Sequence, residues 1–233
     1  MKLEQYTLRG IKFFYRPGFS DLKTFEEVIA RTTYLKRGLK IEKGERWMDC
    51  GGNVGAFALL ACKLGATVNI YEPDPFNCEM IERNLKLNNF TSQAKIIQAA
   101  LVHNQTKETT LFIGNNNAVW RNSIVKKWNN KGLKVPCLNF DKEAQGLDNC
   151  KMDIEGAEMP ILENAKKVFN KLVYEWSFDI DPSLERLWAV IDRQKRHYRV
   201  EAAWSTICYT DKREVTWQKS WFPACTNVFC FRK

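Results

Sequence analysis

The stretch WMDCGGNVGAF, Trp47–Phe57, decides the fold that this sequence predicts. An apolar run breaks into a glycine-rich turn and then continues as apolar residues at helical spacing. A strand, a tight turn and a helix in this order are typical of domains that hold a nucleotide-like cofactor above the turn. The stretch therefore predicts a cofactor site, and its spacing and neighbours decide between cofactors.

Strand-like and helix-like segments alternate from Trp47 onward. Strands are expected at 46–50, 67–73, 94–100, 150–154 and 171–176, and helices at 54–64, 75–88, 158–170 and around 184–191. Two more strands, 198–204 and 226–231, are expected to form a terminal hairpin that gives the sheet an antiparallel edge strand. This alternation predicts an α/β fold, a largely parallel sheet with helices on both faces.

The chain has 233 residues, of which 45% are hydrophobic, so a single domain over 1–233 is expected. Residues 1–46 precede the alternating pattern and are expected to form a cap of one or two helices, with Asp21–Tyr34 the best candidate. Residues 103–134 are rich in Asn and Lys and are expected to be an insertion with a strand at 109–114.

Charge and cysteine usage narrow the class of protein. The net charge of +9 fits a polyanionic partner such as nucleic acid, or simply solvated helix faces such as 164–171. The eight cysteines are scattered and there are only two histidines, so a structural zinc site is not expected. Most of the cysteines are expected to be reduced thiols. No apolar run approaches the ~20 residues of a membrane span, and the charged N-terminus lacks a secretory segment. A cytoplasmic protein is expected.

The turn excludes two common cofactors. Where a dinucleotide fingerprint has its second and third glycines, this chain has Asn53 and Ala56, and no P-loop pattern is present. Asp49 ends the strand and offers a carboxylate to a cationic amino group. Glu72 lies 21 residues beyond Gly51, where an acidic residue holds both hydroxyls of a ribose. A cofactor with an adenosine, an amino-acid end and no phosphate fits these residues, which indicates S-adenosylmethionine.

Three strings carry a family resemblance: 47–57, IYEPDPFNCEMIERNLKLNN at 70–89, and KMDIEGAEMPIL at 151–162. Together they resemble the FkbM-type S-adenosylmethionine-dependent methyltransferases over roughly 44–231, with the N-terminal cap largely unmatched. The resemblance implies the Rossmann-like, seven-stranded sheet of class I methyltransferases. It also implies O-methylation of a sugar, a glycan or another small hydroxylated metabolite. The chain departs from the family in having Cys50-Gly51-Gly52 where a small residue, Gly and Ala are more common.

The resemblance also assigns site residues. It implies that the methionine end, the ribose and the adenine of the cofactor lie against Asp49, Gly51, Gly52, Asn53, Gly55, Glu72, Pro73, Asp74, Ala100 and Leu101, with Asp153 beside them. Asn122 and Ser123 align with a serine-containing stretch of the family. They either contact the cofactor or the substrate, or they are ordinary polar residues of a loop, and both interpretations remain open.

Methyl transfer to an alcohol needs help in removing the hydroxyl proton. Asp153, Glu155 and Glu175 lie at the ends of two predicted parallel strands, where ligands of such sheets bind. Lys151 is expected to pair with these acids, and Glu158 either joins them or caps a helix. Two mechanisms remain open: a carboxylate acts as general base, or Asp153 and Glu175, together with waters, hold Mg²⁺ or Mn²⁺ through oxygen ligands, which we favour.

Two other functional classes are compatible with the cofactor loop. An RNA or other nucleic-acid methyltransferase would suit the basic charge, although the chain lacks an N-P-P-[YF] string for exocyclic amines. A non-enzymatic binding module would have no use for the clustered acids. If the acceptor is a sugar, the cap and the 103–134 insertion should line its site. Four of their aromatic residues are candidates to stack on it: Phe14, Tyr15, Trp120 and Trp128.

Overall fold

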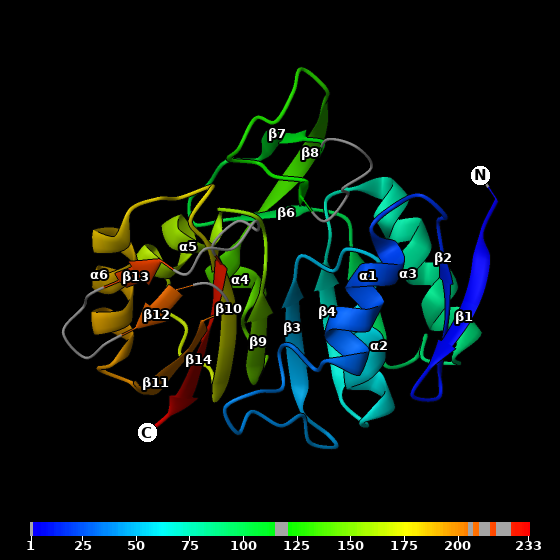
Figure 1. The fold of residues 1–233 in the computed structure, drawn as a ribbon, viewed down its shortest axis with the longest axis horizontal. Helices are drawn as coiled ribbons and strands as arrows, with labels where there is room; N and C mark the ends of the chain where they lie inside the picture. Colours follow the sequence, from blue (N-terminus) through cyan, green and yellow to red (C-terminus); the bar gives the residue numbers. More distant parts are fainter. Residues whose placement is uncertain (1, 115–120, 205–206, 210–214, 218–224) are drawn as a thin grey trace.

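The computed structural model describes residues 2–114, 121–204, 207–209, 215–217 and 225–233. A seven-stranded sheet crosses the centre of the molecule (Figure 1). Its strands lie in the order β11 (Tyr198–Trp204), β14 (Cys225–Arg232), β10 (Lys171–Ser177), β9 (Asn149–Met152), β3 (Arg46–Cys50), β4 (Thr67–Tyr71) and β5 (Ala94–Ile97). Strand β14 runs antiparallel to both of its neighbours, and the other pairs are parallel.

Helices cover both faces of this sheet, as the alternating pattern predicts. One face carries α1 (Asp21–Phe25), the π-helical turn η1 (Glu26–Ala30), α2 (Ala56–Lys63) and α3 (Pro75–Leu87). The other face carries α4 (Phe140–Glu143), α5 (Glu158–Asn164) and α6 (Leu184–Gln194). The strands β3 and β9 are buried on both sides, which explains why their sequences read as continuous apolar runs.

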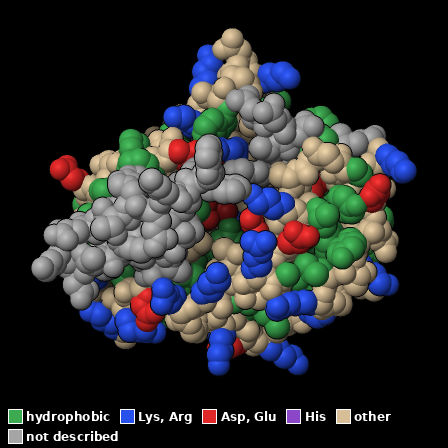
Figure 2. Space-filling model, in the orientation of Figure 1, with side chains coloured by type: hydrophobic (Ala, Val, Ile, Leu, Met, Phe, Trp, Pro, Cys, Tyr) green, Lys and Arg blue, Asp and Glu red, His purple; other side chains and the backbone are tan. Residues whose placement is uncertain are grey.

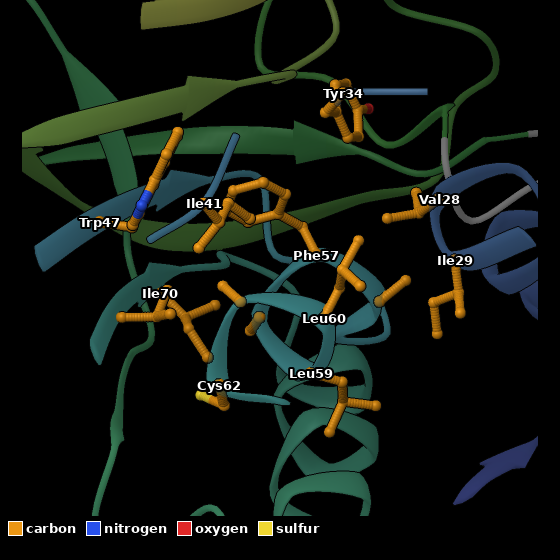
Figure 3. Close-up of a cluster of buried hydrophobic side chains, with 14 of the residues drawn as sticks. Val28, Ile29, Tyr34, Ile41, Trp47, Phe57, Leu59, Leu60, Cys62 and Ile70 are labelled. Carbon is orange, nitrogen blue, oxygen red and sulfur yellow. The ribbon is translucent and has the colours of Figure 1, made fainter. Parts of the chain in front are cut away.

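Alternate residues of β3 supply two separate cores. Trp47 packs against Phe57 of α2, with ring centroids 5.3 Å apart, and Ile70 belongs to the same cluster (Figure 3). Met48 points to the opposite face and joins the cluster beneath α5 and α6. This period-two division is what a strand sandwiched between helix layers requires.

Helix boundaries follow from local capping. Pro75 opens α3, and the side chain of Asp74 accepts a hydrogen bond from the Phe76 amide at 2.9 Å. Helix α5 ends at Asn164, six residues before the predicted end. The backbone amides of Lys166 and Lys167 donate to the side chain of Asp141 in α4 and not to carbonyls of a continued helix.

The prediction that residues 1–46 form only one or two helices is wrong, because this segment begins with a β-hairpin. Residues Glu4–Leu8 (β1) and Ile11–Tyr15 (β2) form an antiparallel hairpin, which packs beside α3 at one end of the molecule (Figure 1). Its two-residue turn, Arg9 and Gly10, has φ values of 48° and 73°, as a type I′ turn requires. Helical structure begins at Asp21, as expected, but ends at Ala30 rather than at Tyr34.

The terminal strands are also rearranged relative to the prediction. Strands β11 and β14 do pair antiparallel, but the antiparallel strand is not at the edge, because β14 inserts between β11 and β10. A short hairpin, β12 (Ile207–Tyr209) and β13 (Val215–Trp217), lies between them in the sequence. Residues 205–206, 210–214 and 218–224 of this connection fall outside the described residues.

The 103–134 region contributes to a small second sheet. Strand β7 (Glu108–Phe112) confirms the strand expected near 109–114, and it pairs with β8 (Gly132–Asn139), which also pairs with β6 (Ala100–Val102). This sheet projects beyond the end of the central sheet toward which β3 and β4 point (Figure 1). In the described part of the chain, no helix is both long and apolar enough to cross a membrane.

Candidate active site

The glycine-rich turn after β3 is shaped by contacts within the protein. The amides of Gly51 and Gly52 both donate to the Tyr71 carbonyl, and Gly51 has a φ of 81°. A Cβ atom on Gly51 would lie 1.9 Å from the Asp153 carbonyl oxygen, and one on Gly52 would lie 2.3 Å from the side chain of Ile70. The glycines are therefore required for the turn to fit between β4 and β9, in addition to any approach of a ligand.

A cavity of about 690 Å³ opens at the carboxyl ends of the central strands. Most of the predicted cofactor residues line it: Gly51, Gly52, Asn53, Glu72, Pro73, Ala100, Leu101 and Asp153. The predicted catalytic residues Lys151, Glu155 and Glu175 line it as well. Three predicted cofactor residues, Asp49, Gly55 and Asp74, are not among the described residues of its wall. Figure 2 shows acidic side chains deep in a hollow whose rim carries Lys and Arg side chains.

Glu72 is buried at the wall and held by the backbone on either side. One carboxylate oxygen accepts the Asn53 amide at 2.7 Å, and the other accepts the Asp74 amide at 2.9 Å. Burial raises the pKa of Glu72 to about 7, although these backbone hydrogen bonds act in the opposite direction. The Asn77 side chain is a third hydrogen-bond partner of this carboxylate, which can accept about four hydrogen bonds in all.

Asp49 faces a cation that the protein itself supplies. The Lys151 ammonium lies 3.1 Å from an Asp49 carboxylate oxygen, and it also donates to the Gly51 carbonyl at 2.7 Å. Burial raises the pKa of Asp49, and Lys151 partly offsets that effect. Burial alone would lower the pKa of Lys151, but Asp49 and Asp153 outweigh it and raise that pKa. Lys151 was expected to pair with Asp153, Glu155 and Glu175, but its ion pair is with Asp49 of the neighbouring strand.

Asp153, Glu155 and Glu175 meet at one end of the cavity. Asp153 accepts a hydrogen bond from the Tyr34 hydroxyl. Burial and the Asp153 carboxylate raise the pKa values of Glu155 and Glu175 well above those of ordinary glutamates. Glu155 has a φ of 53°, a left-handed conformation that is uncommon for residues other than glycine.

Glu158 serves the turn before α5. Its two carboxylate oxygens accept the backbone amides of Ile154 and Gly156, at 2.5 and 2.7 Å. Burial, followed by the charge of Asp153, raises the pKa of Glu158 to about 7. Glu158 therefore stabilises the turn that leads into α5 and does not cap the helix, which has no side-chain cap bond at Ala157.

Asn122 and Ser123 have different surroundings. Asn122 lines the cavity and donates to Asp74 at 2.8 Å, so Asp74 caps α3 with one oxygen and holds Asn122 with the other. Ser123 is buried, donates to the Glu155 carbonyl and accepts the amides of Val125 and Lys126. Ser123 therefore supports the turn that carries Glu155.

The cavity has a wall that the sequence motifs do not reveal. Part of it comes from the N-terminal segment: Lys23, Thr24, Glu27, Val28, Arg31, Thr33 and Tyr34. The cap was expected to line the acceptor site, and these residues of the cap line the cavity. No motif or periodicity in the sequence identifies them individually. The aromatic residues proposed to stack on a sugar lie elsewhere. Phe14 and Tyr15 pack against the core, and Trp128 stacks with Arg121 at 4.0 Å. Trp120 lies outside the described residues.

The metal site predicted at Asp153 and Glu175 needs only these two carboxylates, with waters as the other ligands, and it stays a prediction. Over the described residues, no group of three or more His, Cys, Asp or Glu side chains has an arrangement that could hold a metal ion. One oxygen of Asp153 is already engaged by the Tyr34 hydroxyl. The two carboxylates proposed as ligands, Asp153 and Glu175, thus lack a third protein ligand there.

Comparisons with known proteins agree on the fold. The structure resembles a methyltransferase FkbM from Methylobacillus flagellatus, with a TM-score of 0.54 at 18% identity over 89% of this chain and 48% of that one. A S-adenosylmethionine-dependent methyltransferase from Agrobacterium tumefaciens gives a TM-score of 0.57 at 13% identity, covering 99% of this chain and 70% of that one. A Pyrococcus abyssi tRNA (uracil-54, C5)-methyltransferase in complex with S-adenosyl-L-homocysteine gives 0.52 at 14% identity, covering 99% and 44%.

At these low identities the structural similarity establishes the fold alone, which is that of the class I methyltransferases. No curated protein shows significant sequence similarity to the chain. The model of the methyltransferase FkbM domain, however, matches residues 49–200, which is more than half of the sequence and includes the glycine-rich turn, Glu72 and the acids after β9. The chain therefore belongs to the FkbM methyltransferase family.

Proposed function

We propose that this protein transfers the methyl group of S-adenosylmethionine to a hydroxyl of a sugar, a glycan or a similar small hydroxylated metabolite. The observation that carries the proposal is one continuous cavity. It has the buried Glu72 carboxylate at one part of its wall and the carboxylates of Asp153 and Glu175 at another. A ribose-binding acid and proton-accepting acids on a single wall suit a cofactor and an acceptor bound side by side.

The residues present fit this cofactor. The cavity volume of about 690 Å³ lies within the range of small-molecule sites. Glu72 is buried, its backbone partners fix its orientation, and it keeps capacity to accept a further hydrogen bond, as from a ribose hydroxyl. Pro73 and Leu101 supply apolar wall for an adenine, and Gly51 and Gly52 leave room beside the Lys151–Asp49 pair for the amino-acid end.

The protein contributes positioning and a proton acceptor. S-adenosylmethionine supplies an electrophilic methyl group on a sulfonium. The acceptor oxygen forms its new bond to that methyl carbon as the carbon–sulfur bond breaks, and the hydroxyl proton passes to a carboxylate. Asp153 and Glu175 are placed for that role, and the raised pKa of Glu175 makes it a stronger base than an exposed glutamate. In this scheme the carboxylate takes the proton directly; a divalent ion held by Asp153, Glu175 and waters is the alternative mechanism.

A nucleic-acid acceptor is the alternative, and the net charge of +9 favours it. The charges of the described cavity wall argue against a nucleic-acid acceptor. Its described acidic residues are Glu27, Glu72, Asp153, Glu155, Glu175 and Asp179, against the basic residues Lys23, Arg31, Arg121 and Lys151. Two of these basic residues are engaged by wall acids, Lys23 by Glu27 and Arg121 by Asp179. A wall with more acids than bases suits a neutral polyol better than a phosphate backbone.

The test is methyl transfer from radiolabelled cofactor into a panel of glycans, free sugars, small phenols, nucleosides and RNA, with and without divalent metal. Label in a sugar hydroxyl supports the proposal. Label in RNA, together with salt-dependent retention on RNA, would establish the alternative instead. Cofactor binding measured by calorimetry, with no transfer to any member, would leave a binding module.

A further inference from the structure

Tyr34 brings a buried phenol to the acid cluster from outside the family-matched region of 49–200. It lies after η1, in the N-terminal segment that lines the cavity. Its side chain is 6% exposed, although residues 31–33 and 35–38 around it are exposed or half-buried. A tyrosine that is buried within an otherwise open segment has a specific packing partner or a specific polar partner, and Tyr34 has both.

The ring of Tyr34 is held on two sides. It meets the edge of Phe57 with centroids 6.0 Å apart and an interplanar angle of 83°, and both residues belong to the cluster in Figure 3. The Lys151 ammonium lies 5.3 Å from the centre of the Tyr34 ring. These contacts leave the ring little rotational freedom, so the direction of its hydroxyl is set by the packing of α2 and β9.

The hydroxyl of Tyr34 donates to Oδ2 of Asp153. Among the described residues, no other side chain is seen to donate to this carboxylate, and Asp153 lines the cavity. Burial and the charges of Asp153 and Glu175 raise the pKa of Tyr34 well above 10, which keeps the phenol protonated and a donor. The remaining charged groups that face Asp153 are Lys151, Asp49, Glu155, Glu158 and Glu175.

We propose that Tyr34 is a positioning residue for acceptor activation: its hydroxyl orients Asp153 so that Oδ1 faces the acceptor hydroxyl. This inference rests on the proposed methyl transfer. It also gives the N-terminal segment a role beside the family-matched region, because Tyr34 of that segment bonds to an acid after β9. The family-matched residues alone leave Oδ2 of Asp153 without a donor among the described side chains.

The test compares Tyr34→Phe with Tyr174→Phe. Tyr34→Phe keeps the ring contacts and removes only the hydroxyl. Tyr174 is also a buried tyrosine, but its hydroxyl bonds to Gln194 at 3.0 Å in the opposite core, away from the cavity. Both variants should lose similar stability in thermal unfolding, because each loses one buried hydrogen bond. With the first acceptor that the wild type methylates, only Tyr34→Phe should lower kcat, by about 10- to 100-fold, as expected for a lost bond to a charged group. Its Kd for S-adenosylmethionine should remain within about threefold of the wild-type value.

A second measurement does not depend on any acceptor. In protein labelled with ¹³C-aspartate, the carboxyl resonance of Asp153 is identified by its loss in Asp153→Asn. It should move in Tyr34→Phe and stay in place in Tyr174→Phe. An unmoved resonance, or a moved resonance with kcat unchanged, overturns the role of Tyr34. Failure of the wild type to methylate any acceptor counts against the proposed function instead, and the resonance still decides whether Tyr34 orients Asp153.

Discussion

At the scale of single residues, Glu72 is the most constrained group in the cavity. It is buried, it accepts two backbone amides, and its pKa is raised to about 7 by burial. We expect Glu72→Ala to weaken cofactor binding by about 2–4 kcal/mol, because two hydrogen bonds to a charged acceptor are lost. Isothermal titration calorimetry measures this directly. Glu82→Ala is the matched control, since Glu82 is an exposed acid of the following helix, paired with Lys86. Equal affinities of Glu72→Ala and wild type for the cofactor would remove Glu72 from the site.

In the proposed reaction, the acids after β9 and within β10 accept the hydroxyl proton. If Asp153 is the general base, Asp153→Asn should lower the rate by roughly 10²- to 10⁴-fold with cofactor binding retained. Glu175→Gln should have a similar effect if it shares the proton, and little effect if it does not. Single-turnover kinetics with the labelled cofactor separates these outcomes. A double variant with full activity would show that the acceptor binds at other strand ends.

Chelation separates the two mechanisms that the sequence leaves open. If a carboxylate takes the hydroxyl proton directly, EDTA should leave the rate unchanged. Loss of turnover in EDTA, restored by Mn²⁺ or Mg²⁺ and absent in Asp153→Asn, would instead support the oxygen-ligand site predicted at Asp153 and Glu175.

At the scale of elements, the glycine-rich turn was predictable and the N-terminal hairpin was not. The turn lies between a buried strand and an apolar helix, and glycines, which adopt positive φ at little cost, mark it in the sequence. The hairpin sequence carries Arg9-Gly10 at its turn in place of the stronger Asn-Gly or Asp-Gly signal. Its β1 strand is mostly exposed, so the strand lacks a clear apolar alternation. The hairpin is stabilised by α3, where Asn84 and Asn88 bond to the backbone of Phe14 and Lys12, and such long-range bonds leave no local signal.

A substitution in the turn tests whether its glycines serve the fold. A left-handed alanine alone costs about 1–2 kcal/mol. Gly51→Ala should destabilise the protein by more than that, because the new Cβ would lie 1.9 Å from the Asp153 carbonyl oxygen. Gly146→Ala is the control, since Gly146 has a φ of 76° but no atom within 4 Å of the position that a Cβ would take. Chemical denaturation without cofactor measures both. Equal destabilisation of the two variants would mean that the turn shifts to accept the alanine and that its glycines matter for the ligand alone.

At the scale of the whole molecule, sheet topology explains which site residues could be predicted together. The carboxyl ends of parallel strands share one edge, so the sequence alone predicts that Glu72 after β4 and Asp153 after β9 share a site. The N-terminal wall was expected only as a region. The position of Tyr34 depends on where the chain turns after η1 and on its packing against Phe57, and neither has a period or motif in the sequence.

The same clustering of buried acids makes the stability of the whole molecule depend on pH. Burial raises the pKa values of Glu72 and Glu158 from 4.5 to about 7, and those of Asp49, Glu155 and Glu175 are raised too. From about pH 5 to about pH 7 the folded protein therefore binds more protons than the unfolded chain, and linkage requires the free energy of unfolding to fall as pH rises. The exposed acids with lowered pKa values, such as Glu82 and Asp148, act below that window.

We therefore expect the thermal unfolding midpoint of the cofactor-free protein to fall between about pH 5 and about pH 8. The stabilisation is present in full below the unfolded pKa of these acids and is lost as pH rises through their folded values. Glu72→Gln removes one of these titrating groups, so its midpoint should fall less steeply over the same range, whatever its stability at any single pH. Scanning calorimetry of the two proteins across the range measures the slopes. A midpoint that stays constant or rises would mean that the acids around the cavity are hydrated in the free protein, and the proton-accepting role of Glu175 would then lose its basis in burial.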